Sequence, residues 1–140
     1  MGDTSDWSHQ MVLAASPVSA SKARDFVCFH LVEHHEVDLV DDVRLVVSEL
    51  ATNAVAHAQT PFVVTLSLAD QLVLVVIQDT STSVPVRRSP EVTDLSGRGL
   101  MIVELLSQDW GTHTDAEGTK SVWASFSSVS GQRERGTSVA

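Results

Sequence analysis

The sequence has one cysteine, few basic residues and no long apolar run, and each scarcity excludes a class of protein. Cys28 has no second cysteine to pair with, so an internal disulfide is excluded and we expect a reducing compartment, the cytoplasm. The longest uninterrupted apolar run covers residues 72–77, whereas a membrane-spanning helix needs roughly 20 residues. The polar, acidic segment 1–10 lacks the layout of a secretory signal. We therefore expect a soluble protein with no membrane partner.

Basic residues are half as common as acidic ones, with 9 Lys and Arg against 18 Asp and Glu and a net charge of -9. A field of that sign repels a phosphate backbone, so we expect no nucleic-acid partner. The 140 residues, 43% of them hydrophobic, predict one domain with one core. We expect it to cover residues 12–126, between flexible segments at 1–11 and 127–140 that carry little to bury.

Apolar residues recur at three-to-four spacing in three segments, which predicts helices. The first begins after Ser19 or Ser21 and ends near the histidine pair at residues 34–35. The second begins after Asp38 and ends before Pro61, and the third covers residues 100–106.

Two pairs of strands follow from alternation and apolar runs. Phe62, Val64, Leu66 and Leu68 alternate with Val63, Thr65 and Ser67, and residues 72–77 are apolar throughout, as in a strand covered on both faces. A tight turn at Asp70 and Gln71 joins them, and strands at 108–114 and 120–126 flank a turn at 115–118. Residues 80–96, rich in Thr, Ser, Pro and Arg, predict an irregular loop. The order predicts an α+β fold: a two-layer sandwich whose mixed, mostly antiparallel sheet carries helices on one face.

Glu49 and Asn53 stand one turn apart on the second helix, at the margin of its apolar stripe. A carboxylate and a carboxamide there could act as a base and a metal ligand. The alternative is a solvated helix face. Asp79 ends the most apolar strand and could accept from the exocyclic amino group of a base, or else bond the backbone of the following turn.

Two glycine-containing turns complete the set of candidates. Gly97-Arg98-Gly99-Leu100 stands directly before a predicted helix. The two glycines let the backbone approach a ligand closely, and the free amides of a helix start favour an anion such as phosphate. Arg98 adds a bidentate hydrogen-bond donor. The third glycine of the dinucleotide-binding fingerprint is missing, because residue 102 is Ile. Gly118-Thr119-Lys120 could approach the same ligand. Ordinary loop-to-helix and hairpin turns are the alternatives.

Taken in order, these segments resemble the Bergerat ATP-binding fold shared by gyrase, Hsp90, histidine kinases and MutL (the GHKL superfamily). Within it, the chain resembles the small single-domain anti-sigma factor serine/threonine kinases of actinobacteria. Residues 45–58 resemble the N box of that family, Asp79-Thr80-Ser81 its first glycine box, residues 96–103 its second, and residues 118–124 its terminal strand motif. The resemblance covers about residues 17–126.

The resemblance implies ATP and Mg²⁺ as cofactors and a role for each candidate residue. Glu49 would be the catalytic base, Asn53 the Mg²⁺ ligand and Asp79 the acceptor for the adenine amino group. Thr119 would support the adenine end. The phosphates would be held at the helix start, by Gly97, Arg98, Gly99 and Leu100.

The function implied is that of a cytoplasmic anti-sigma factor in transcription regulation, which also phosphorylates a serine on an anti-anti-sigma protein of the STAS type. The alternative is a weak or inactive ATP-binding module that regulates a partner by contact alone. Ser81, where the family has glycine, and a short lid with Pro85 and Pro90 favour that alternative. A third interpretation is a metabolic ATPase. A homodimer through a sheet edge or the first helix is left open.

Two further groups of residues have structural interpretations. His30 and His34 have zinc-ligand spacing, but no third ligand is evident, so we expect packing histidines and assign no metal there. The acidic residues of segment 33–42 predict a solvated face, or alternatively a surface that meets a basic patch on a sigma factor. They are Glu33, Glu36, Asp38, Asp41 and Asp42.

Overall fold

The computed structural model describes residues 6–57, 60–80 and 97–128 of the 140-residue chain. In chain order the elements are β1 (Trp7–Leu13), α1 (Ser19–Glu33), a short 3₁₀ helix η1 (Val37–Leu39), α2 (Val40–His57), β2 (Phe62–Ala69), β3 (Leu72–Asp79), α3 (Gly97–Leu106), β4 (Asp109–Thr114) and β5 (Lys120–Ser127).

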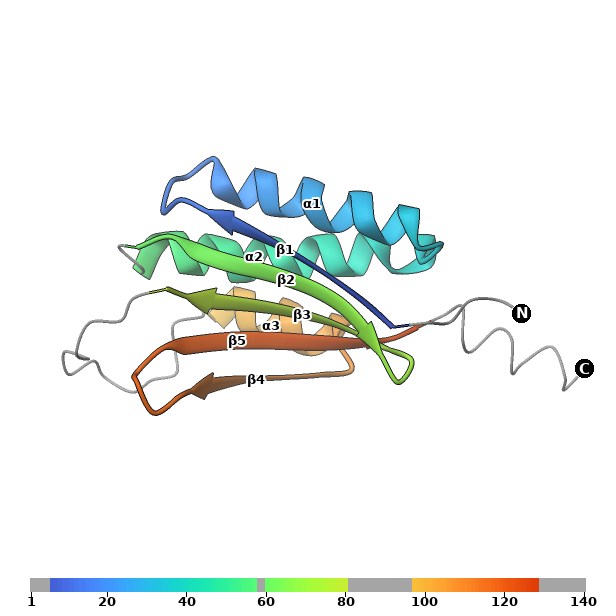
Figure 1. Ribbon diagram of the computed structural model, residues 1–140. Coiled ribbons are helices and arrows are strands. Elements are labelled where there is room, and N and C mark those ends of the chain that lie inside the picture. Colours follow the sequence, from blue (N-terminus) through green and yellow to red (C-terminus); the bar gives the residue numbers. More distant parts are fainter. Residues whose placement is uncertain (1–5, 58–59, 81–96, 129–140) are drawn as a thin grey trace, which may run out of the picture.

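The strands form one five-stranded sheet in the order β1-β2-β3-β5-β4, and every pair within the described residues is antiparallel. All three α-helices lie on the same face of this sheet (Figure 1). This confirms the predicted α+β sandwich. Asp70 and Gln71 both adopt positive φ, 52° and 67°, as a two-residue hairpin with the right-handed twist of its strands requires.

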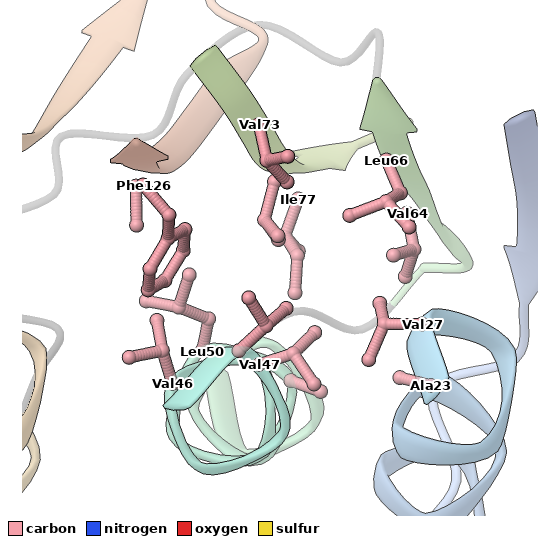
Figure 2. Packing of buried hydrophobic residues seen from close by; sticks show 14 of the residues in the cluster. Ala23, Val27, Val46, Val47, Leu50, Val64, Leu66, Val73, Ile77 and Phe126 are labelled. Carbon is pink, nitrogen blue, oxygen red and sulfur yellow. The ribbon is translucent and has the colours of Figure 1, made fainter. Parts of the chain in front are cut away.

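The core lies between α1 and α2 and the inner face of the sheet. Alternate residues of β2 are buried, beginning with Phe62, because successive side chains of a strand point to opposite faces. Val46, Val47 and Leu50 of α2 face β3 and β5, while Val27 of α1 faces β2 (Figure 2). Burying each such side chain contributes about 1.5–3 kcal/mol, so these contacts hold the helices on the sheet.

The prediction that residues 72–77 are covered on both faces is wrong. Val73, Val75 and Ile77 are buried beneath the helices, whereas Leu72, Leu74 and Val76 are half-exposed on the opposite face. No described helix covers that face (Figure 1). An apolar run does not distinguish a strand under a second layer from a central strand whose outward side chains are shielded by neighbouring strands.

The chain enters the sheet earlier than predicted. Residues 7–11, expected to be flexible, belong to β1, which pairs with β2 from Trp7 opposite Leu68 to Leu13 opposite Phe62. Composition misled the prediction, because Ser8 and Gln10 alternate with side chains that face the helices. At the other limit, Ser127 ends β5 and Ser128 is buried. Segments 1–5 and 129–140 lie outside the described residues.

Glu36 does not belong to the solvated acidic face, because it is only 3% exposed. Its Oε2 accepts a hydrogen bond of 2.7 Å from Ser128 Oγ, and its Oε1 has no hydrogen-bond partner among the described residues. The solvated acidic surface comprises Glu33, Asp38 and Asp41, with Asp42 half-buried. No helix in the described part of the chain is both long and apolar enough to cross a membrane.

Candidate functional site

The predicted site segments gather at one end of the molecule, which we call the motif end. It comprises the C-terminal half of α2, the last residues of β3, the first turn of α3 and the β4–β5 turn (Figure 1). The sheet register accounts for part of this arrangement. Phe62 pairs with Asp79 where β2 begins and β3 ends, and Gln78 pairs with Ser121 where β5 begins.

On α2, Glu49 and Asn53 are both half-buried, at the margin of the apolar stripe as predicted. Val46, Val47 and Leu50 are buried against the sheet, and this packing fixes the rotation of the helix about its axis. The two polar side chains are four residues apart and so follow one another by one turn on one side of the helix. α3 packs against α2.

At the end of β3, Asp79 is half-buried and its Oδ1 accepts a hydrogen bond of 2.8 Å from Thr60 Oγ1. Thr80 binds the same neighbouring segment, since its N–H and Oγ1 donate to the Pro61 carbonyl oxygen at 3.3 and 2.7 Å. Three hydrogen bonds therefore clamp the end of β3 to residues 60–61. Sequence reasoning missed Thr60, whose only signal was a hydroxyl directly before Pro61.

The two glycines of the second glycine box lie inside a helix instead of before it. α3 begins at Gly97, three residues earlier than predicted, so Gly99 and Leu100 belong to its first turn. Gly99 is buried and Leu100 half-buried. The backbone N–H groups of a first turn point along the helix axis, at the positive end of the helix dipole. The side chain of Arg98 and residues 81–96, with Ser81, Pro85 and Pro90, lie outside what the structure describes.

The β4–β5 turn is organised by Asp115, a residue that sequence reasoning passed over. Its Oδ1 accepts from the backbone N–H of Glu117 and of Thr119, both at 2.9 Å. The Asp115 N–H donates to the Thr119 carbonyl oxygen at 3.0 Å, and Gly118 has φ of 88°. A carboxylate four residues before Thr119 therefore fixes its backbone, and the left-handed conformation at residue 118 favours glycine.

Residues 13–126 match a family model described as the histidine kinase-like ATPase domain. The chain belongs to this family. The match covers most of the chain and includes all four segments of the motif end, which makes this an ATP-binding domain. No curated protein matches the sequence.

Among solved structures, this histidine kinase-like ATPase domain is similar to the RsbU and RsbW domains of Rv1364c from Mycobacterium tuberculosis. The TM-score is 0.65 at 20% sequence identity, and the likeness covers 86% of this chain. The chain spans 32% of the length of that structure. At this identity the likeness concerns the fold, the same helix-on-sheet arrangement.

The donor set at the motif end fits a magnesium nucleotide. Asn53 offers a carboxamide oxygen, one of the hard oxygen ligands that Mg²⁺ prefers, and the carboxylate of Glu49 stands one turn away on the same helix. The described residues hold no group of three or more His, Cys, Asp or Glu side chains able to bind a metal. Asn53 would hold a magnesium ion together with phosphate and water ligands, as is common for Mg²⁺.

Cys28 lies outside the motif end, half-buried on α1. Burial raises the pKa of its thiol, and the nearby Arg44 opposes this only in part. The thiol form is therefore favoured at neutral pH, and this residue has the low reactivity expected of a small packing side chain.

Proposed function

We propose that the chain is an ATP-dependent switch protein that binds a sigma factor and phosphorylates a serine on an anti-anti-sigma protein of the STAS type. One observation carries the proposal. In a histidine kinase-like ATPase domain, a helix with a carboxylate and a carboxamide, a strand-end carboxylate and a helix start with two glycines lie at one end.

In this proposal each candidate side chain has one task. Asp79 accepts a hydrogen bond from the adenine amino group, and Thr119 supports the same part of the nucleotide. The α3 amides around Gly97 and Gly99 hold the phosphates, because the helix start favours anions. Arg98 and Leu100 complete this phosphate contact. Asn53 holds Mg²⁺, which neutralises phosphate charge when it is bound.

Glu49 acts as the base in the transfer. It takes the proton from the hydroxyl of the protein serine as the serine oxygen attacks the γ-phosphorus. The bond from that phosphorus to the bridging oxygen of ADP breaks, so phosphoserine and ADP are the products. Most of the rate comes from positioning and from charge stabilisation by the helix-start amides.

The partner part of the proposal rests on two observations. The domain resembles in fold a structure that contains an RsbW domain. The surface around α1 and α2 is acidic, with Glu33, Asp38 and Asp41 exposed and a net charge of -9 over the chain, which suits a partner with a basic surface.

A phosphate-transfer assay tests the proposal. The protein is incubated with γ-labelled ATP, Mg²⁺ and a candidate STAS-type protein, and the label on the acceptor is measured. We expect transfer by the wild type and a loss of at least about 100-fold for Glu49→Gln, because general bases commonly contribute that much.

Glu104→Gln, which removes an exposed carboxylate from α3, is the matched control and should transfer at the wild-type rate. Equal transfer by Glu49→Gln and wild type would contradict the kinase proposal. ATP binding without transfer to any acceptor would favour the second candidate, a module that regulates by contact alone. Steady phosphate release without a partner would favour a metabolic ATPase.

A further inference from the structure

Three histidines and a tryptophan meet where the start of β1 packs on the last turn of α1, far from the motif end. The His9 ring stacks on His30 with centroids 3.8 Å apart and an interplanar angle of 11°. His9 Nε2 lies 2.9 Å from His34 Nε2, and Trp7 stacks on His34 at 4.0 Å and 6°. We call these four residues the histidine cluster.

The geometry of the histidine cluster does not suit a metal ion. A ring nitrogen binds a metal in the plane of its ring, and the planes of His9 and His30 are nearly parallel and stacked. Their lone pairs therefore do not converge on one point. β1 supplies His9 as a third histidine beside His30 and His34, which the sequence did not reveal.

The contact between His9 and His34 depends on protonation. One Nε2 must carry a hydrogen and the other must present a lone pair, which neutral rings or one charged ring can satisfy. With both rings charged, two N–H groups face each other at 2.9 Å and the hydrogen bond is lost. Stacking on Trp7 tolerates one positive ring, since the indole face attracts cations.

Burial lowers the pKa of His30 and of His34, and the neighbouring His9 lowers both further. The carboxylate of Glu33 opposes the shift at both rings, and that of Glu36 opposes it at His34. His35 lowers the pKa of His34 slightly.

Uncharged side chains also pack against the histidine cluster within the described residues. Phe26 and Phe29 place ring edges against His30. From β2, the buried Leu66 and Leu68 stand opposite His9 and Trp7 in the strand register. Burial and the neighbouring His9 outweigh the carboxylates, so the pKa values of His30 and His34 are lowered and neutral rings are favoured in the folded protein.

We propose that the histidine cluster is a proton-operated latch that holds the edge strand β1 on α1 while its rings are neutral and loosens β1 when a second ring gains a proton. β1 pairs only with β2 among the described strands, so its helix-facing side chains provide its other main attachment. This latch is independent of the proposed kinase function.

The direction of the pH dependence follows from linkage. In the unfolded chain these histidines titrate near pH 6.5, whereas His30 and His34 titrate lower in the fold. The unfolded or undocked state therefore binds more protons on acidification. Docking of β1 is fully favourable above about pH 6.5 and weakens as the pH falls below that value.

Amide hydrogen exchange on the full chain tests the latch. Protection factors, corrected for intrinsic exchange at each pH, are compared at pH 7.5 and pH 5.5 for β1 and for β4, the edge strand on the opposite side of the sheet. We expect protection in β1 to be about tenfold lower at pH 5.5 than at pH 7.5, because binding one more proton in the undocked state changes the docking equilibrium tenfold for the one pH unit below 6.5. Protection in β4 should stay constant.

His9→Gln removes the ring that contacts both helix histidines and lowers their pKa, so we expect the pH-dependent loss of β1 protection to be clearly smaller in this variant than in the wild type. His113→Gln, on exposed β4, is the matched control and should retain the wild-type response. Constant protection of wild-type β1 at both pH values, or an unchanged response in His9→Gln, would overturn the proposal.

A second measurement needs no variant and so holds even if His9→Gln fails to fold. Imidazole ring signals of the wild type are followed by NMR against pH. We expect His30 and His34 to titrate below pH 6.5 with broadened, coupled curves, and the indole signal of Trp7 to shift with them. Independent titration of all three rings near pH 6.5 would sink the latch.

Discussion

The motif end and the histidine cluster lie at opposite ends of the sheet and are built differently. At the motif end, polar side chains at the ends of elements are held by hydrogen bonds, as from Asp115 to the turn that contains Thr119 and between Thr60 and Asp79. The histidine cluster is a stack of rings whose partners are far apart in the chain, since His34 stands 25 positions after His9. Helical spacing and glycine-containing turns leave a motif in the sequence, whereas stacking between rings far apart in the chain leaves none.

The largest expected effect tests whether the two ends form one cooperative unit. Phe62 is fully buried and pairs with Leu13 of β1 on one side and with Asp79 of β3 on the other. Phe62→Ala should lower the free energy of unfolding by about 3–5 kcal/mol. Urea unfolding followed by tryptophan fluorescence and by circular dichroism should give one shared transition.

Val63→Ala, on the half-exposed face of the same strand, is the control and should cost much less. Two separate transitions in the wild type or in Phe62→Ala would contradict the single unit and would make the ends independent.

A smaller effect should be confined to the motif end. Asp79→Ala removes the proposed charged hydrogen bond to adenine, worth about 1.5–3 kcal/mol, so ATP affinity should fall by about tenfold to 100-fold. Calorimetric titration with ATP and Mg²⁺ measures this change. Asp25→Ala, which removes an exposed carboxylate from α1, should leave the affinity unchanged. Equal ATP affinity in Asp79→Ala and wild type would refute the adenine assignment.

The smallest effect concerns the hydroxyl that holds Asp79. Thr60→Val deletes the donor to Asp79 Oδ1 with little change of shape, a loss of about 1 kcal/mol or roughly fivefold in ATP affinity. Thr60→Ser keeps the donor and should bind ATP as the wild type does. If the valine and serine variants have the same ATP affinity, Thr60 has no positioning role.

Most of the fold could be predicted because its signals are periodic. Alternation in β2 and the stripe on α2 record burial residue by residue. The predictions that fail concern residues whose strand pairing or burial depends on contacts with distant parts of the chain. The polar composition of residues 7–11 hides a strand that pairs with β2, and the apolar run of β3 does not distinguish its half-exposed side from its buried side. The buried Glu36 accepts a hydrogen bond from Ser128, 92 positions later in the chain.

The candidate site also contains residues that the sequence pattern predicts and residues that only the structure reveals. The helical spacing of Glu49 and Asn53 predicted their place at the margin of the core stripe. Thr60 and Asp115, which bind Asp79 and the Thr119 turn, escaped notice because a hydroxyl or a carboxylate in a loop is common. The chemical roles of the site residues stay predictions.

The hydrogen bonds of Ser128 have a practical consequence for attaching the protein to a surface or a label. Its N–H donates to the Gln71 carbonyl oxygen at 2.9 Å and its hydroxyl to Glu36, so the chain is anchored as it leaves the sheet. The eight residues of β5 separate this anchor from the Thr119 turn by about 26 Å at about 3.3 Å per residue. A surface tether or fluorophore joined directly after Ser128 would thus start about 26 Å from the turn that holds the proposed adenine-side residue Thr119.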